Sequence, residues 1–143
     1  MARDLFVNRE PDYTDLDLDF IKHPTTGDVV KKSGVEAIKR SVRNVIFYNF
    51  YEKPFQPYFG SNVRGLLFDN VTPLTSIYLQ NAIREVLDNF EPRIKVTDVV
   101  VTDQNTEAGS NTIDRNGYEV RIDYIILNKN LPVSATLFLE RIR

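Results

Sequence analysis

The residues that decide the fold run from Pro73 to Val101 and spell PLTSIYLQNAIREVLDNFEPRIKVTDVVV. In the first part, apolar residues recur at steps of three and four, which is the period of an amphipathic helix. Thr72 and Pro73 are a typical helix start, because threonine can cap the first N–H groups and proline has none to leave unsatisfied. Pro92 disfavours the helical conformation at Glu91, so the helix is predicted to end at or just before that residue.

The predicted helix has a buried face and a solvent-exposed face. Glu85 and Asp88 fall on the solvent-exposed face, opposite the apolar stripe. The stripe consists of Leu79, Ala82, Ile83, Val86, Leu87 and Phe90.

Everything after Pro92 is predicted to form strands. Residues 94–101 are rich in branched side chains, and residues 118–126 and 133–139 alternate apolar and polar side chains. Three antiparallel strands are the simplest arrangement, joined by a long polar loop at 103–116 and a tighter turn at 128–132. The predicted fold class is therefore α+β, with a mostly antiparallel three-stranded sheet at the C-terminal end.

A second long helix is predicted before these elements. Ser33 stands three residues before Glu36, the spacing of a capping box, so we expect the helix to begin there. One face is apolar and the other is basic, with Lys39, Arg40 and Arg43. The apolar face is made of Val35, Ile38, Val42, Val45 and Ile46.

Residues 1–32 lack a helical period and are predicted to be an extended N-terminal arm, ahead of one domain at 33–143. Leu16, Leu18 and Phe20 alternate with aspartates, which favours a short strand or an arm with one apolar side. Residues 1–20 are acidic and residues 31–43 basic. Such charge runs are usually exposed and solvated, although a docking surface remains an alternative.

The stretch YEKPFQPYFG at residues 51–60 contains four aromatic residues and two prolines. The prolines restrict it to turn and extended forms, so it is predicted to be a stiff connector. The aromatic residues could form a recognition platform, but we expect them to cover the core as a lid. A short helix is predicted to follow at residues 62–68.

Length and composition exclude several classes of protein. At 143 residues the chain can build one well-buried core. The absence of cysteine excludes disulfides, thiolate zinc sites and cysteine nucleophiles. There is no apolar run near the roughly 20 residues of a membrane helix and no signal-peptide pattern, so we expect a soluble protein without a membrane partner. A net charge of -2 gives no general attraction to nucleic acid, and the basic face is small.

Few residues could carry catalysis or bind a cofactor. His23 is the single histidine, so no serine triad or histidine-rich metal site can form. Asp15, Asp17 and Asp19 resemble the start of a calcium loop but lack its later ligands, and no phosphate-binding glycine motif occurs. No cofactor or metal is expected. Glu91, with Glu85 and Asp88, has the spacing of a glycosidase pair, but the latter two lie on a polar helix face where nothing would raise a pKa.

The last predicted strand favours a binding role. Residues 133–142 have no later segment in the sequence to cover the strand edge, and an exposed edge can pair with a strand of another chain. Its alternating apolar residues Val133, Ala135, Leu137 and Leu139 are the candidate site. Charged residues near the end of the strand could instead hinder pairing with another strand, and the pattern leaves both alternatives open. These charged residues are Glu140, Arg141 and Arg143.

Three motifs occur in order: KPFQPYFG at 53–60, LFDNVTPLT at 67–75 and NFEPRI at 89–94. With them the chain, from about Tyr13 to its C-terminus, resembles the small baseplate wedge proteins of T-even phages, which have relatives in contractile tails and type VI secretion baseplates. The resemblance is weakest at residues 103–116. It implies a structural protein rather than an enzyme.

The resemblance also implies partners and a location. Family members bind the helical core bundle of the larger wedge proteins around the tail tube, which is a further candidate partner. They present a sheet on which the first ring of sheath subunits assembles. The resemblance implies six copies in the baseplate of a virion that is assembled in the host cytoplasm. It implies no contact with nucleic acid. Some relatives are also described as lysozymes, which makes a wall-degrading enzyme the alternative function.

The Glu-Pro-Arg motif is the hallmark that the resemblance associates with the core bundle, and here it is Glu91, Pro92 and Arg93. In an extended segment, residues two apart point to the same side, so Glu91 and Arg93 are expected to emerge together beside a rigid Pro92. An internal salt bridge between them is the alternative. The resemblance favours the partner contact.

Overall fold

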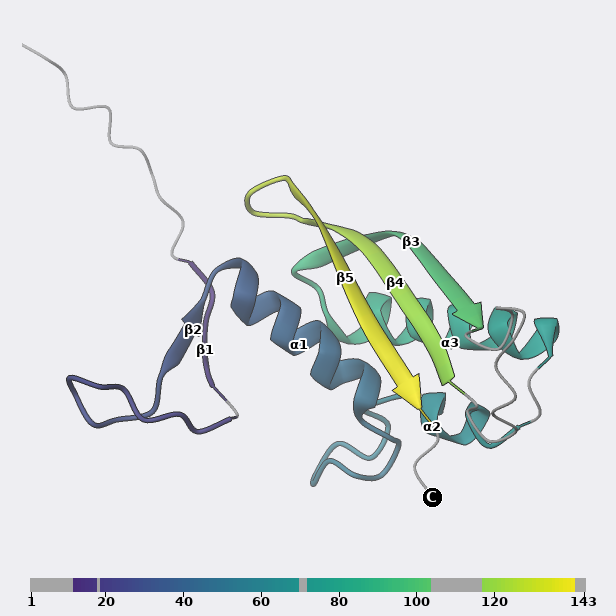
Figure 1. Ribbon diagram of the computed structural model, residues 1–143, viewed down its shortest axis with the longest axis horizontal. Coiled ribbons are helices and arrows are strands. Elements are labelled where there is room, and N and C mark those ends of the chain that lie inside the picture. Colours follow the sequence, from purple (N-terminus) through teal and green to yellow (C-terminus); the bar gives the residue numbers. More distant parts are fainter. Residues whose placement is uncertain (1–11, 18, 70–71, 104–116, 141–143) are drawn as a thin grey trace, which may run out of the picture. The chain divides into compact units, whose positions relative to one another are not determined.

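The computed structural model describes residues 12–17, 19–69, 72–103 and 117–140. The chain divides into two compact units, residues 1–38 and 39–143, and each is described separately. Figure 1 gives the element labels. The α+β class is confirmed, with three helices and a C-terminal antiparallel sheet.

The first unit contains a small antiparallel hairpin of β1 (Thr14–Leu16) and β2 (Lys31–Ser33). The short-strand alternative thus holds for residues 14–16. Leu16 and Phe20, which were predicted to share one apolar side, are both exposed, while Leu18 lies outside the described residues. The buried side chain is instead Asp17, whose carboxylate lies 3.2 Å from the Lys32 ammonium group.

The hairpin leads directly into α1 (Val35–Phe47). The predicted start at Ser33 is wrong by two residues, because Ser33 still pairs with Thr14 in the hairpin. Gly34 then turns the chain with a φ of 61°, a conformation that glycine adopts without steric cost. The N–H of Gly34 donates to the Tyr13 carbonyl, so the turn is tied to the hairpin.

The second unit is built on the sheet β3 (Ile94–Asp103), β4 (Gly117–Ile126) and β5 (Leu131–Glu140), in that order and antiparallel throughout. Helix α3 (Pro73–Phe90) contacts β3, and α2 (Val63–Leu66) contacts α3. These elements confirm the predicted short helix, long helix and three strands. As predicted, the Thr72 side chain caps α3 by accepting the Thr75 N–H.

In the second unit α3 lies against one face of the sheet (Figure 1), and the buried core residues lie on that face. Every second residue of β4 is buried, and the side chains between them are at least partly exposed, so helices cover a single face. The helical contribution comes from the predicted stripe of α3 and from the later part of α1. The largest contributors are Val42, Val45, Ile46, Leu79, Ile83, Leu87, Val99, Tyr118, Ile122, Tyr124, Ile126 and Leu139.

Candidate functional site

The chain turns sharply between α3 and β3, at Glu91-Pro92-Arg93. Helix α3 ends at Phe90, and Glu91 has left the helical conformation with φ −122° and ψ 76°, as the following proline predicts. The Ile94 N–H donates to the Glu91 carbonyl at 3.3 Å, so residues 91–94 form a tight turn with Pro92 in its second position. The expectation of an extended segment is therefore wrong, because proline at this position favours the turn.

Within this turn the side chains of Glu91 and Arg93 bind each other. Arg93 Nε donates to Glu91 Oε1 at 2.5 Å, and Arg93 Nη2 donates to Oε2 at 2.6 Å. Ser41 Oγ, from α1, donates to Oε2 at 2.5 Å. The Glu91 side chain is only 2% exposed and that of Arg93 is 27% exposed. The structure thus contains the internal salt bridge, in a buried form.

The surroundings of Glu91 act on its pKa in opposite directions. Burial raises the pKa of the carboxyl group, but the hydrogen bonds from Arg93 and Ser41, with the charge of Arg93, outweigh burial and hold the pKa below its ordinary value. Glu91 is therefore ionised at neutral pH. A general acid of a glycosidase needs the opposite shift.

The turn ties three elements together. The Glu91 N–H donates to Leu87 in the last turn of α3, Ser41 belongs to α1, and the Arg93 carbonyl accepts the Leu127 N–H just after β4. Pro92 at the apex is exposed. The result is a rigid corner with an exposed proline and a partly exposed arginine, which we call the EPR corner.

The second candidate site is the edge of β5. Val133 and Ala135 are half-buried, and Leu137 and Leu139 are buried, so the four predicted residues lie on the core face of the sheet. A strand added to β5 would meet their backbone rather than their side chains. The exposed side chains alternate with them, and the alternation in the sequence already contained this signal. They are Ser134, Thr136, Phe138 and Glu140.

The two outer strands of the sheet differ in regularity. The β4–β5 register runs without a shift from Gly117–Glu140 to Ile126–Leu131. In β3, by contrast, the register shifts between Val96 and Asp98, which indicates a bulge at Thr97. Asp98 there also pairs with Arg84 of α3 at 3.8 Å. Bulges and charged side chains hinder strand addition, so β5 has the more accessible edge.

The aromatic stretch at 51–60 does not cover the core, so the predicted lid is wrong. Tyr51, Phe55 and Tyr58 are exposed, and only Phe59 packs inward, with its ring centroid 4.8 Å from that of Phe90. The Tyr51 N–H donates to the Pro57 carbonyl at 2.8 Å, so the stretch closes on itself instead of folding over the sheet.

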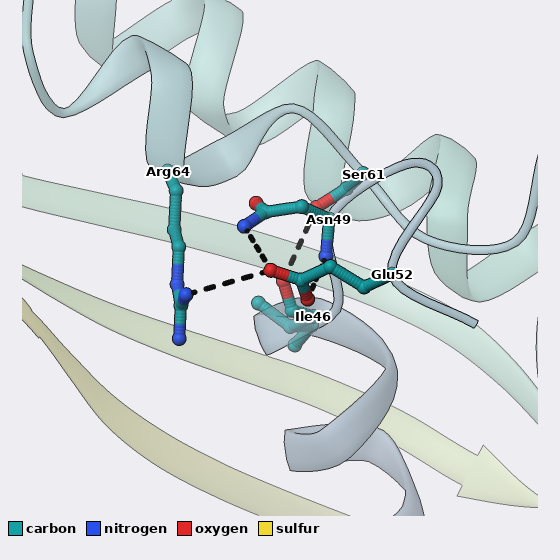
Figure 2. A network of polar contacts seen from close by, with 5 residues as sticks. All are labelled: Ile46, Asn49, Glu52, Ser61 and Arg64. Atoms are coloured by element: carbon teal, nitrogen blue, oxygen red, sulfur yellow. Dashed lines mark hydrogen bonds and ion pairs between the residues drawn. The ribbon is translucent and has the colours of Figure 1, made fainter.

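The two ends of this stretch are held by hydrogen bonds beside the end of α1 (Figure 2). Ser61 Oγ donates to the Ile46 carbonyl at 3.1 Å, one of the carbonyls that a helix end leaves without a helical partner. The Glu52 carboxylate accepts from the backbone and the side chain of Asn49 at 2.9 and 2.8 Å, and Arg64 lies 3.7 Å away. The Asn49 hydrogen bonds lower the pKa of Glu52.

A groove of about 670 Å³ opens beside this network. Its lining includes loop residues Phe50 and Tyr51, α2 with the turn that follows it, and Glu140 at the end of β5. Phe68 is an exposed part of the wall, while Leu67 is buried. No local sequence pattern indicates the groove, because its walls come from three separate segments.

No described residues form a metal-binding group, and no described helix has the length and apolarity for a membrane span. Asp17, which belonged to the calcium-like pattern, is engaged by Lys32. His23 Nδ1 accepts the N–H groups of Thr25 and Thr26, both at 3.3 Å, so the single histidine shapes a local turn. Glu85 and Asp88 are exposed on α3, as predicted.

The fold is that of known tail and baseplate proteins. A Geobacter sulfurreducens protein described as a candidate tail lysozyme superposes with a TM-score of 0.63 at 20% identity, over 76% of this chain and 91% of that one. A chain of the anti-feeding prophage baseplate superposes with a TM-score of 0.61 at 19% identity, over 92% and 88%. At these identities the comparison establishes a shared fold.

The sequence identifies the family. The model of the family "Baseplate wedge protein gp25" matches residues 32–131, and the chain belongs to this family. It is 35% identical over 82 residues to baseplate wedge protein gp25 of Enterobacteria phage T4. That match spans 57% of this chain and 61% of the T4 protein, so the chain aligns with about three-fifths of its relative. The resemblance seen in the motifs is confirmed.

Proposed function

We propose that the chain is a structural wedge subunit of a contractile-tail baseplate, which binds the core bundle of the larger wedge proteins and starts the sheath through β5. Membership of the gp25 family and the fold shared with a baseplate chain support the first part. In a six-fold baseplate such as that of the anti-feeding prophage, each tail would hold six copies. The location would be the virion, after assembly in the host cytoplasm.

The observation that carries the sheath-initiating role is the difference between the two sheet edges. β5 offers ten residues in unbroken register, whereas β3 is interrupted at Thr97 and carries the Arg84–Asp98 pair. Pro132 lacks an N–H and limits pairing at the start of β5. Residues 133–140 therefore form the open edge to which a sheath strand would be added, with the backbone supplying the hydrogen bonds.

The EPR corner is suited to the core-bundle contact by its rigidity. Because Glu91 is buried and bound by Ser41 and Arg93, a partner would meet Pro92 and the exposed side of the Arg93 guanidinium. A guanidinium has five N–H donors, so Arg93 can bind Glu91 and still donate to a partner carbonyl or carboxylate. Glu91 would then act by holding Arg93 in place.

Amide exchange tests the β5 edge directly. Along a strand the N–H groups point alternately to either side, so half of the β5 amides face the open edge and are expected to exchange fast. Addition of the purified sheath subunit of the same tail should slow the exchange of these amides and leave β3 unchanged. If β5 shows no added protection in a complex that does form, strand addition at this edge is excluded.

The corner is tested by co-purification with the larger wedge proteins of the same tail. Arg93→Ala should weaken binding, whereas Ser41→Ala removes a buried hydrogen bond and leaves the exposed corner unchanged. The second variant is thus a control for general loss of stability. Equal binding by Arg93→Ala and the wild-type chain would exclude the corner as the contact.

A further inference from the structure

The groove beside α2 begins where β5 ends. Glu140 is the last residue of β5 and also lines the groove, together with Phe50 from the loop and Phe68 after α2. A strand that pairs along β5 and continues past Glu140 is therefore directed toward the groove. Glu140 is thus shared by the open edge and the groove, and both lie within the second unit.

The walls of the groove are largely preformed. The loop wall is held at Asn49 by Glu52 and at Ser61 by the Ile46 carbonyl, as Figure 2 shows. A parallel bridge joins Asn49 to Ser61, and the Ser61 N–H donates to the Tyr48 carbonyl at 2.9 Å. Binding in a preformed groove loses less conformational entropy than binding that must order a loop.

The chemistry of the groove is mixed. Phe50 and Phe68 are 44% and 57% exposed, so both present apolar surface on the groove wall. Arg64 lies on the lining with a side chain that is 53% exposed, and its distance to Glu52 is 3.7 Å. Such a site suits an apolar side chain with a carboxylate nearby.

We propose that this groove receives the part of the added sheath strand that extends beyond Glu140, and that an aromatic or large aliphatic side chain of that segment packs against Phe50 and Phe68. An acidic group next to this anchor would meet Arg64. The inference rests on the proposed strand addition at β5 and names the feature that selects the strand. Backbone pairing alone does not distinguish one sequence from another, whereas a side-chain pocket does.

An extended segment fits the position of the groove better than a separate molecule does. Once a strand is paired with β5, its next residues are held beside the groove at high effective concentration. The anchor then also fixes the register, because a shift by one residue would turn its side chain to the other face of the strand.

The test compares Phe68→Ala with Phe55→Ala in the full chain. Phe55 is an exposed aromatic residue of the same loop region that does not line the groove, so it is a matched control. The probe is the purified sheath subunit of the same tail, titrated while its effect on β5 amide exchange is followed. Phe68→Ala should raise the Kd at least about tenfold, as loss of an interface anchor does, and Phe55→Ala should leave it unchanged.

The outcomes separate this inference from the proposed function. If β5 becomes protected but Phe68→Ala binds as tightly as the wild-type chain, the groove is not used and strand addition stands. If the sheath subunit neither binds nor protects β5, the proposed function fails. The proposed side-chain anchor in the groove then fails as well. If the isolated chain dimerises and Phe68→Ala abolishes the dimer, the groove belongs to a second copy and the inference is overturned.

Discussion

The guanidinium of Arg93 forms two hydrogen bonds to the carboxylate of Glu91, two residues earlier, at 2.5 and 2.6 Å. Pairs this close in sequence meet here because the turn at Pro92 brings the two side chains together. Both carboxylate oxygens are used, and Ser41 adds a third bond. The pair thus joins the end of α3, the start of β3 and α1, so its removal should affect the whole second unit.

Arg93→Ala should lower the free energy of unfolding by roughly 2 to 3 kcal/mol, somewhat less than the roughly 3 to 5 kcal/mol of a fully buried pair because Arg93 is partly exposed. The cost arises because the Glu91 carboxylate stays buried without the guanidinium, and only Ser41 and the Arg93 backbone N–H remain among the groups that lower its pKa. Urea unfolding measures it. Arg121→Ala is the control, since Arg121 pairs with Asp123 at 3.4 Å on the exposed face and should cost less than about 1 kcal/mol. Equal costs would contradict the buried role of Arg93.

The stabilising effect of Glu91 should depend on pH. Its pKa in the folded chain is below the ordinary 4.5, so the unfolded chain takes up the proton first as the pH falls. The contribution of Glu91 is complete above about pH 4.5 and disappears as the pH passes below the lowered pKa. The difference in unfolding free energy between the wild-type chain and Glu91→Gln should shrink over that range.

Thermal or urea unfolding from pH 7 to pH 2 measures this difference. Glu52 and Asp123 also have lowered pKa values, but both are present in each protein, so their effects cancel. A difference that grows toward low pH would mean that the pKa of Glu91 is raised, contrary to the hydrogen bonds in the structure.

Gly60→Ala should destabilise the segment that carries the groove. The φ of Gly60 is 120°, and an added Cβ would lie 2.6 Å from the Tyr48 carbonyl oxygen, so both the backbone and the packing would be strained. We expect a loss of about 1 to 3 kcal/mol. Gly65→Ala is the control, because the three atoms nearest its added Cβ all belong to the Asn62 side chain, which can rotate away. Differential scanning calorimetry should show a clear fall in Tm for Gly60→Ala alone.

The wild-type chain should not digest purified peptidoglycan. Glu91 is buried and its pKa is lowered, so it cannot serve as the proton donor that glycoside hydrolysis requires. Loss of turbidity of a peptidoglycan suspension measures digestion, with a known lysozyme as the positive control. Digestion by the wild-type chain that Glu91→Gln abolishes would establish the enzyme alternative.

The helices and strands could be predicted because their periods are local. The apolar stripe of α3 and the alternation in β4 each require only their own residues. The turn at Pro92 was predicted as a helix end but not as a turn, although the bond between Ile94 and Glu91 is local and proline favours the second position of a turn. The contact between Ser41 and Glu91 spans 50 positions and leaves no local pattern.

Other features depended on tertiary structure in a different way. The stretch at 51–60 has the composition of a lid, and only its closure between Tyr51 and Pro57 shows why it stays outside. The difference between the sheet edges depends on a one-residue bulge at Thr97. The sequence around Thr97 is rich in branched residues and is typical of a regular strand, so it does not indicate the bulge. Local composition therefore predicted which segments are apolar, but not which of them the fold would cover.

The bulge in β3 also limits how many further strands the sheet can accept. A regular three-stranded sheet could accept a strand at either side and could link molecules into an open-ended ribbon of its own copies. Under the proposed strand addition, the interrupted β3 and the unbroken β5 would leave the described sheet with one edge for one incoming strand. On this proposal, a ring of such molecules would start as many strands as it has members.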